Sequence, residues 1–483
     1  MEQLSQVPMP PRSSTRPAGR AATPAQVLII VCAGVVLASL DLFIVNVALP
    51  RIAVDFGTRD LGALSWVLNG YAIVYASLLV FFGRMADRHR RNDGFLLGVA
   101  VFTAASAACA LANSVGMLVA FRLIQAAGAA LLTPTSLGLV LASFPAERRG
   151  GAVRAWTATG GLAAALGPVI GGLLVTASWR WVFLVNVPIG LLALVVGRFR
   201  LPDVPGHPGP RPDALGTALV TAGVGSLTFA LVKGNDWGWG SWTTVTVLVG
   251  AVALLALFVV HCLRARNPLV DPGLFGVITF SGATLVAALF SASFGGMLLS
   301  VVLWEQDAWG WSALRSGLAI APGPLMVPVF SFLVAGRLIA RWGAAVVICL
   351  GSLAFAAGLS WFTLTVSSEP HYAGTMLPGI LLTGVGVGLT LPTIMATGTG
   401  ALPPPAFATG SAVINMMRQT GLAVGVAVFV AVLGTPVSAA GRLAAFHRAW
   451  WVLAAVAMLG TVPAVLCLRS RPRRELIGSA TGR

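Results

Sequence analysis

The feature that most constrains this fold is a succession of long apolar segments separated by short polar ones. A membrane-spanning helix needs about 20 apolar residues, and about fourteen segments meet this requirement. We expect helices over residues 26–50, 62–83, 94–112, 115–143, 151–176, 181–199, 213–233, 242–263, 277–303, 312–336, 344–363, 373–398, 406–434 and 446–468. Hydrophobic residues fill 57% of the 483 positions and charged residues only 10%. The chain is therefore predicted to be an all-α integral membrane protein, because one soluble core could not bury so much apolar surface.

The distribution of basic residues predicts which side of the membrane carries the termini. Cytoplasmic segments of membrane proteins are enriched in Lys and Arg. Most of the 31 basic residues fall near the two ends of the chain or in the connections on the same side, such as residues 84–91 and 148–154. Both termini are therefore expected in the cytoplasm. Because these residues form no contiguous patch, the net charge of +16 does not indicate a nucleic-acid partner.

Three charged residues interrupt the apolar segments: Asp41 in the first predicted span, Arg122 in the fourth and Arg418 in the thirteenth. A helix rises about 1.5 Å per residue, so each would lie about 8–12 Å from the non-cytoplasmic edge of the hydrocarbon core. A charge in the bilayer is costly and is usually retained for a function. We therefore predict a shared polar cavity at this depth. The residues expected to line it are Asn46, Gln125, Asn415, Arg418 and Gln419.

Asp41 is the predicted proton carrier of this cavity, with Arg122 as its partner. Burial disfavours an ionised carboxyl group and a neighbouring arginine favours it, so the acid could exchange its proton near neutral pH. Substrate and proton would then compete for a cavity that opens alternately to the two faces. A static buried ion pair is the alternative. Because the two arginines make the cavity formally basic, neutral, zwitterionic or anionic substrates are expected over dications.

Several short motifs follow one another in a fixed order. They are Leu40–Pro50, Gly83-x-x-Ala86-Asp87-Arg88-x-x-Arg91, Arg122-x-x-Gln125, Gly167-Pro168-x-x-Gly171-Gly172, Ser178–Pro188 and Arg418-Gln419-x-Gly421. Taken together, they resemble the drug:proton antiporters of the major facilitator superfamily, in the branch with fourteen spans. The resemblance covers nearly the whole chain after residue 25.

The resemblance implies the major facilitator fold, with two six-helix bundles and two extra central helices. The expected parts are a disordered cytoplasmic N-terminus at 1–25, a six-helix bundle at 26–199, a linker with two extra helices at 200–263, a second six-helix bundle at 264–468 and a basic cytoplasmic tail at 469–483. It also implies proton-coupled efflux of small, largely hydrophobic drugs or antibiotics by alternating access. A dedicated exporter of one secreted metabolite, conferring self-resistance, is the alternative. The implied partners are a small-molecule substrate, protons and the lipid bilayer, with a monomeric protein and no cofactor or metal ion.

The resemblance gives roles to two of the motifs. A conformational latch at the cytoplasmic face is implied for Gly83, Asp87, Arg88 and Arg91. Gly83 would permit a tight turn there, and a similar Gly/Arg turn is expected at Ala335–Arg341. The motif that begins at Gly83 departs from the family pattern at Arg90 and Asn92. An antiporter signature that permits close helix approach is implied for Gly167, Pro168, Gly171 and Gly172.

The remaining polar residues give little support to other classes of function. Glu305 and Asp307 follow the ninth predicted span and are expected to be solvated loop charges, with a cation-attracting vestibule as the alternative. A membrane-embedded enzyme is the rival class, but His89-x-x-x-Asp93 resembles an acyltransferase pair only superficially. The one lysine of the sequence, Lys233, belongs to no Gly-rich nucleotide-binding loop. The sequence therefore predicts a transporter that is not driven by ATP.

Overall fold

The computed structural model describes residues 22–468 apart from 59, 207–210, 404–405 and 437. Over these residues the chain is helical and contains no β-strand, which confirms the all-α prediction. Of the N-terminal segment expected to be disordered, 1–25, residues 1–21 lie outside the described residues. The expected basic tail at 469–483 lies outside them entirely.

The first group of helices is α1 (Pro24–Asp55), α2 (Leu61–Arg88), α3 (Arg91–Ala110), α4 (Val115–Ser143), α5 (Ala146–Ala177), α6 (Trp181–Leu184) and α7 (Asn186–Arg200). An extra pair follows, α8 (Ala214–Trp237) and α9 (Trp242–Arg264). The second group is η1 (Pro272–Gly276), α10 (Ile278–Leu303), η2 (Trp304–Ala308), α11 (Ala313–Ile320), α12 (Pro322–Pro328), η3 (Val329–Ala335), α13 (Gly336–Trp342), α14 (Ala344–Thr365), α15 (Tyr372–Thr375), α16 (Leu377–Gly400), α17 (Phe407–Leu433), α18 (Ala439–Leu459) and α19 (Thr461–Cys467).

These helices occupy the positions of the predicted spans. In the described part of the chain, 13 helical segments are long and apolar enough to cross a membrane. Helix α5 lies at the position of the remaining predicted span and has 32 residues, enough to extend about 48 Å. Several spans consist of consecutive helical pieces, such as α6 with α7 and α10 with η2.

The structure corrects the two predicted Gly/Arg turns. Gly83 to Arg88 belong to the last turns of α2, and the His89 amide closes that helix by donating to the Met85 carbonyl at 3.2 Å. Ala335 to Arg341 are likewise helical, at the end of η3 and in α13. Both segments continue with good helix formers and without proline, so the helical hydrogen bonds extend past the apolar stretch. Gly83 therefore makes no tight turn.

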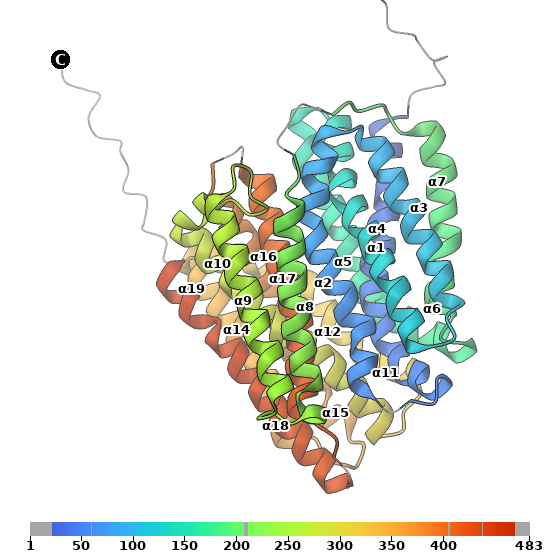
Figure 1. Cartoon of the computed structure of the whole chain (residues 1–483), viewed down its shortest axis with the longest axis vertical. Helices are drawn as coiled ribbons and strands as arrows, with labels where there is room; N and C mark the ends of the chain where they lie inside the picture. The colour runs from blue at the N-terminus through green and yellow to red at the C-terminus, as the bar shows by residue number, and fades with distance from the viewer. Residues whose placement is uncertain (1–21, 59, 207–210, 404–405, 437, 469–483) are drawn as a thin grey trace, which may run out of the picture.

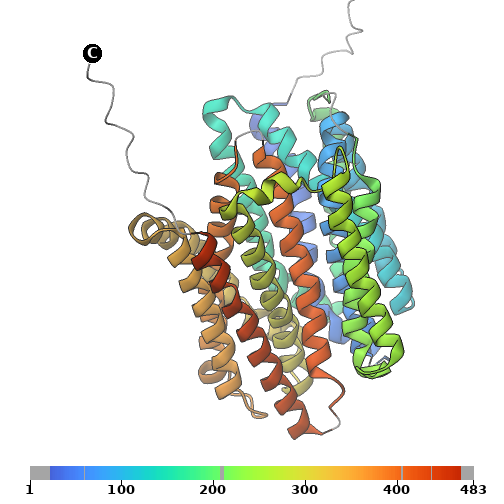
Figure 2. The same ribbon diagram turned by 60° about the vertical axis from the view of Figure 1, so that its left-hand side comes forward.

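The long helices run roughly along one axis of the molecule, with α1–α7 on one side and α10, α14 and α16–α19 on the other (Figure 1). Helix α8 packs against α9, α2 and α17, so the extra pair covers the seam where α2 meets α17. Figure 2 shows this pair as a hairpin along the outside of the bundle. Because α1 begins and α19 ends at the same end of the molecule, we call that end the terminal face and the opposite end the far face.

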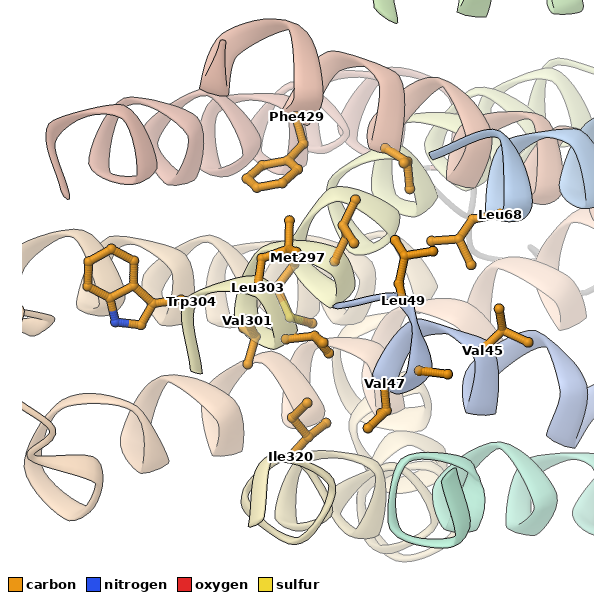
Figure 3. Packing of buried hydrophobic residues seen from close by; sticks show 14 of the residues in the cluster. Val45, Val47, Leu49, Leu68, Met297, Val301, Leu303, Trp304, Ile320 and Phe429 are labelled. Carbon is orange, nitrogen blue, oxygen red and sulfur yellow. The ribbon is translucent and has the colours of Figure 1, made fainter. Parts of the chain in front are cut away.

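A cluster of buried apolar side chains joins the two groups of helices near the far face (Figure 3). We call it the far seal; its labelled members are Val45, Val47 and Leu49 of α1, Leu68 of α2, Met297, Val301 and Leu303 of α10, Trp304 of η2, Ile320 of α11 and Phe429 of α17. Each of these side chains is at most 7% exposed. Burial of apolar side chains stabilises their contact, so the far seal holds the two groups together at this face.

Asp213 joins the extra pair to the following segment at the terminal face. Its carboxylate caps α8 by accepting a hydrogen bond from the Gly216 amide at 2.8 Å. It also accepts one from the Leu269 amide at 2.8 Å and lies 3.0 Å from His261 Nε2 of α9. Burial of this carboxyl group works against ionisation, but the hydrogen bonds from Gly216, His261 and Leu269 outweigh it and hold the pKa of Asp213 below its usual range.

Replacing Asp213 by Ala should lower the thermal stability of the protein. The change removes a helix cap, which costs about 1 kcal/mol, and leaves the Leu269 amide unpaired, which costs about 1–3 kcal/mol. We expect the Tm of the purified protein to fall by several degrees. The control Asp203→Ala removes the exposed ion pair with Arg90 at 3.0 Å and should cost less than about 1 kcal/mol. Equal Tm values for the two variants would contradict this assignment.

Candidate functional site

A buried ion pair joins Asp41 of α1 to Arg122 of α4. Both side chains are 0% exposed, and their two helices pack against each other. A charge in a low-dielectric interior is tolerated only when it is paired and hydrogen-bonded. The structure thus places the two residues predicted for proton coupling in direct contact.

Polar side chains from two further helices surround the Asp41 carboxylate. Gln125, one turn after Arg122, accepts a hydrogen bond from Arg122 Nη1 at 2.6 Å and donates one to Asp41 Oδ1 at 2.9 Å. Asn186 at the start of α7 donates to the same oxygen at 3.2 Å. Ser106 of α3 accepts hydrogen bonds from both amides. Asp41 therefore accepts three hydrogen bonds, an arrangement that suits an ionised carboxyl group.

Arg122 is also held by α2, independently of Asp41. Its Nε atom donates to the Val67 carbonyl at 3.1 Å, and its guanidinium lies 4.1 Å from the centre of the Tyr71 ring. Its Nη2 atom has no hydrogen-bond partner among the described residues. Neutralising Asp41 would consequently break the ion pair without removing the other contacts that position Arg122.

A small cavity lies between the two groups of helices, and its lining includes residues that directly follow Asp41 and Val67 in the chain. The residues that line it are Leu42, Phe43, Asn46, Leu68, Asn69, Ala72, Gly295, Leu298, Leu422, Ala423 and Val426. Its volume is about 40 Å³, whereas pockets for drug-sized ligands have about 300–1,000 Å³. The cavity has room for water but must widen to hold a substrate. Asn46, one of the predicted cavity residues, contributes its amide to the lining.

The predicted cavity residues of α17 form a separate polar group. Arg418 Nη1 donates to Asn415 Oδ1 at 3.1 Å, and the guanidinium interacts electrostatically with Tyr75 of α2. Arg418 Nε and Gln419 Oε1 are buried without a hydrogen-bond partner in the part of the chain that the structure describes. Arg418 thus pairs with Asn415 of its own helix, while Gln125 belongs to the Asp41 network.

The predicted latch residues lie at the terminal ends of α2 and α3. Arg91, the first residue of α3, donates through Nη1 to the Gly138 carbonyl of α4 at 3.3 Å. Gly83 faces Pro134 of the same helix. Arg88 ends α2, and the Asp87 side chain lies outside the described structure. Their role as a latch stays a prediction.

The predicted antiporter signature lies where α5 packs against two helices. A Cβ atom added at Gly167 or Gly171 would lie 2.7 or 2.9 Å from atoms of residues 43–44 in α1. One added at Gly172 would lie 2.6 Å from a backbone oxygen of α11, and the Pro168 carbonyl contacts α11 as well. These small residues therefore bring α5 close both to the helix that carries Asp41 and to the second group.

Sequence reasoning missed several polar residues of the site. Asn186 occurs in the Ser178–Pro188 motif but received no role, and Ser106 is a lone hydroxyl in an apolar span. Asn69 and Tyr71 are polar residues of the second span that are also fully or almost fully buried. The signal that could have found them is the one that identified Arg122, namely a polar side chain at the depth of Asp41.

Glu305 corrects another expectation, because it is not a solvated loop charge. The helix continues past Leu303 as the π-helical turn η2, which directs Glu305 inward, and its side chain is 0% exposed. Asp307, two residues later, is exposed as expected.

The buried ion pair and the cavity between two groups of spanning helices define a multi-spanning membrane transporter. Residues 31–426 match the family model of the Major Facilitator Superfamily, and the chain belongs to this family. It is accordingly a multi-pass protein of the cell membrane, as the sequence predicted.

Known relatives include exporters of antibiotics. The chain is 33% identical over 428 residues to the tetracenomycin C resistance and export protein of Streptomyces glaucescens. The aligned region covers 86% of this chain and 78% of that protein. It is 34% identical over 444 residues to the cephamycin export protein of Amycolatopsis lactamdurans, with 90% of each chain covered. Among solved structures, an auto-inhibited POT family peptide transporter matches with a TM-score of 0.67 at 17% identity, over 95% of this chain and 99% of that one. That structural likeness shows the shared fold alone.

The Asp41→Asn variant should be destabilised by about 3–5 kcal/mol, because it leaves the Arg122 charge buried without its counter-charge. Adding Arg122→Gln to the same chain should recover most of this loss. Unfolding of the purified variants measures the coupling. The control Asp236→Asn alters a half-exposed pair with Lys233 at 2.8 Å and should cost less than about 1 kcal/mol. Strictly additive losses in the double variant would refute the energetic coupling of the pair.

Proposed function

We propose that the protein exports small, largely hydrophobic drugs or antibiotics in exchange for protons, by alternating access. The observation that carries this proposal is the buried Asp41–Arg122 pair beside a cavity between the two groups of helices. The export functions named for the relatives support the substrate class. We place both termini in the cytoplasm, from the basic residues at the terminal face, and we propose a monomer.

Protonation of Asp41 would act on the helix that also reaches the far seal. Asp41 lies four to eight residues before Val45, Val47 and Leu49, which is about 6–12 Å along α1. A proton on Asp41 would replace its ion pair with Arg122 by a weaker neutral contact, while Arg122 keeps its contacts with α2. Helix α1 would then be held less firmly to α4. Proton binding and rearrangement of the seal are thereby linked through one rigid helix.

The predicted division of the chain fits this movement. We propose that the segments at 26–199 and 264–468 act as the two moving bundles and that 200–263 provides the linker and the two extra helices. Helix α8 contacts α2 and α17 across the junction, which supports a role in keeping the bundles together. The latch residues at the terminal ends of α2 and α3 would stabilise one of the two conformations.

The lining of the cavity supports a preference in substrate charge. Its side chains are apolar apart from the amides of Asn46 and Asn69, and none of the lining residues is acidic. We therefore propose that neutral, zwitterionic or anionic compounds are preferred over dications. An exporter dedicated to one metabolite is the second candidate, because the relatives include proteins named for single antibiotics, tetracenomycin C and cephamycin.

The Asp41→Asn variant should lose export driven by a pH gradient in proteoliposomes, because an amide cannot bind and release the coupled proton. We expect a loss of at least tenfold in the pH-driven rate. The Asp41→Asn, Arg122→Gln double variant controls for misfolding, since it lacks both charges and should fold yet remain uncoupled. The exposed variant Glu369→Gln should transport normally. Wild-type coupling and rate in Asp41→Asn would refute the carrier role.

A matched panel of neutral, anionic, zwitterionic and dicationic compounds should separate the two substrate hypotheses. A multidrug exporter should transport several hydrophobic scaffolds and take dications least, because no acid lines the cavity. A dedicated exporter should transport one scaffold only. Uptake into inverted vesicles, with and without a protonophore, measures both properties. Strong dication transport would contradict the proposed charge preference.

A further inference from the structure

Glu305 is a buried carboxyl group that the mechanism above does not use. It lies in η2, the π-helical turn between α10 and α11, and it is 0% exposed. Neither of its carboxyl oxygens has a hydrogen-bond partner among the described residues. Isolated π-helical turns occur often at functional sites, because the extra residue redirects a side chain.

The polar groups nearest to Glu305 leave it without a counter-charge in contact. Ser316 of α11 approaches the carboxyl group, but its hydroxyl is also unpaired within the described structure. Arg315 interacts with Glu305 electrostatically from beyond ion-pair distance, and its guanidinium lies 4.0 Å from the centre of the Trp311 ring. Tyr372 also interacts electrostatically with Glu305, while its hydroxyl donates to the Ala319 carbonyl at 2.7 Å.

The other ionisable groups of this region have different contacts. Asp307 is exposed on the same turn, and its carbonyl accepts a hydrogen bond from Arg442 Nη1 of α18 at 3.2 Å. His447 of α18 lies 3.1 Å from the Val366 carbonyl through Nε2. Burying a carboxylate without donors or a contacting cation costs several kcal/mol, whereas the neutral acid is tolerated. The surroundings of Glu305 in this conformation therefore favour the neutral, protonated acid.

The turn that carries Glu305 is part of the far seal. Gln306 Nε2 donates to the Val47 carbonyl of α1 at 3.0 Å, across the junction of the two groups. The neighbouring Leu303 and Trp304 are buried in the same apolar cluster (Figure 3), where the Trp304 ring packs against Phe446 and Trp450 of α18. Separation of the two groups at this face would bring water to the turn. A hydrated carboxyl group is ionised at neutral pH.

We propose that Glu305 is a second proton-binding site, distinct from Asp41, which holds a proton while the far seal is closed and releases it when the seal opens. The part of this proposal that concerns opening rests on the proposed alternating access. Because the closed form binds the extra proton, acid at the far face favours closure and alkaline conditions favour opening. Glu305 exchanges its proton with the far face alone and sets the pH dependence of the seal.

The bound proton is tested first, without substrate or transport. Infrared spectra of the purified protein at neutral pH should contain the carbonyl band of a protonated carboxylic acid, and Glu305→Gln should remove it. The control Asp307→Asn alters the neighbouring exposed acid and should leave the band in place. An unchanged band in Glu305→Gln would overturn the proposal. This readout does not depend on export, so it separates a failure here from a failure of the proposed function.

The effect on the seal is tested with a cysteine placed at Leu49, which is 1% exposed. The labelling rate of Leu49→Cys by an impermeant maleimide, added at the far face, should increase from pH 6 to pH 9. This increase should be severalfold larger than the increase for an exposed reference cysteine. With Glu305→Gln added, that excess rise should disappear, because the amide cannot ionise. With Asp307→Asn added, it should persist. The same pH dependence in both double variants would overturn the link between Glu305 and the seal.

Discussion

The interaction on which the rest of this structure depends is the buried ion pair of Asp41 and Arg122. Neither charge could be kept at 0% exposure alone, so each fixes the position of the other. The hydrogen bonds around the pair come from α3, α4 and α7, and Arg122 adds α2 through the Val67 carbonyl. Five helices of the first group are thus held in register by one polar network, whereas apolar packing alone would allow several arrangements.

Helix α1 connects this polar network with the cavity and with the far seal. Within two to three turns it carries Asp41, the cavity residue Asn46 and the apolar side chains of the far seal. Its opposite neighbour α5 approaches so closely at Gly167 and Gly171 that α1 cannot shift alone. Gly172 brings the same helix α5 against α11, so closely packed backbones connect α1 with the second group through α5.

The sequence predicted the spans and the partner of Asp41, because both follow from simple helical geometry. Apolar length sets the spans, and the rise per residue sets the common depth of Asp41 and Arg122. Depth carries no information about direction around a helix, so it could not show that Arg418 pairs with Asn415 of its own helix and not with the Asp41 network. The length of an apolar stretch also cannot show how far its helix continues into the polar residues that follow. For this reason the sequence predicts a turn at Gly83 and a solvated Glu305, whereas α2 continues past Gly83 and η2 continues the helix through Glu305.

Asp41 and Glu305 show how burial alone leaves the protonation of an acid undetermined. Both side chains are 0% exposed, yet Asp41 accepts three hydrogen bonds and contacts an arginine, while Glu305 has neither within the described residues. Donors and a cation favour the carboxylate, and their absence favours the acid. The two buried acids therefore have opposite surroundings in the same closed conformation. In the proposed opening of the far seal, Glu305 would be hydrated before Asp41, because its turn contacts Val47 of α1 through Gln306, whereas Asp41 lies deeper along α1.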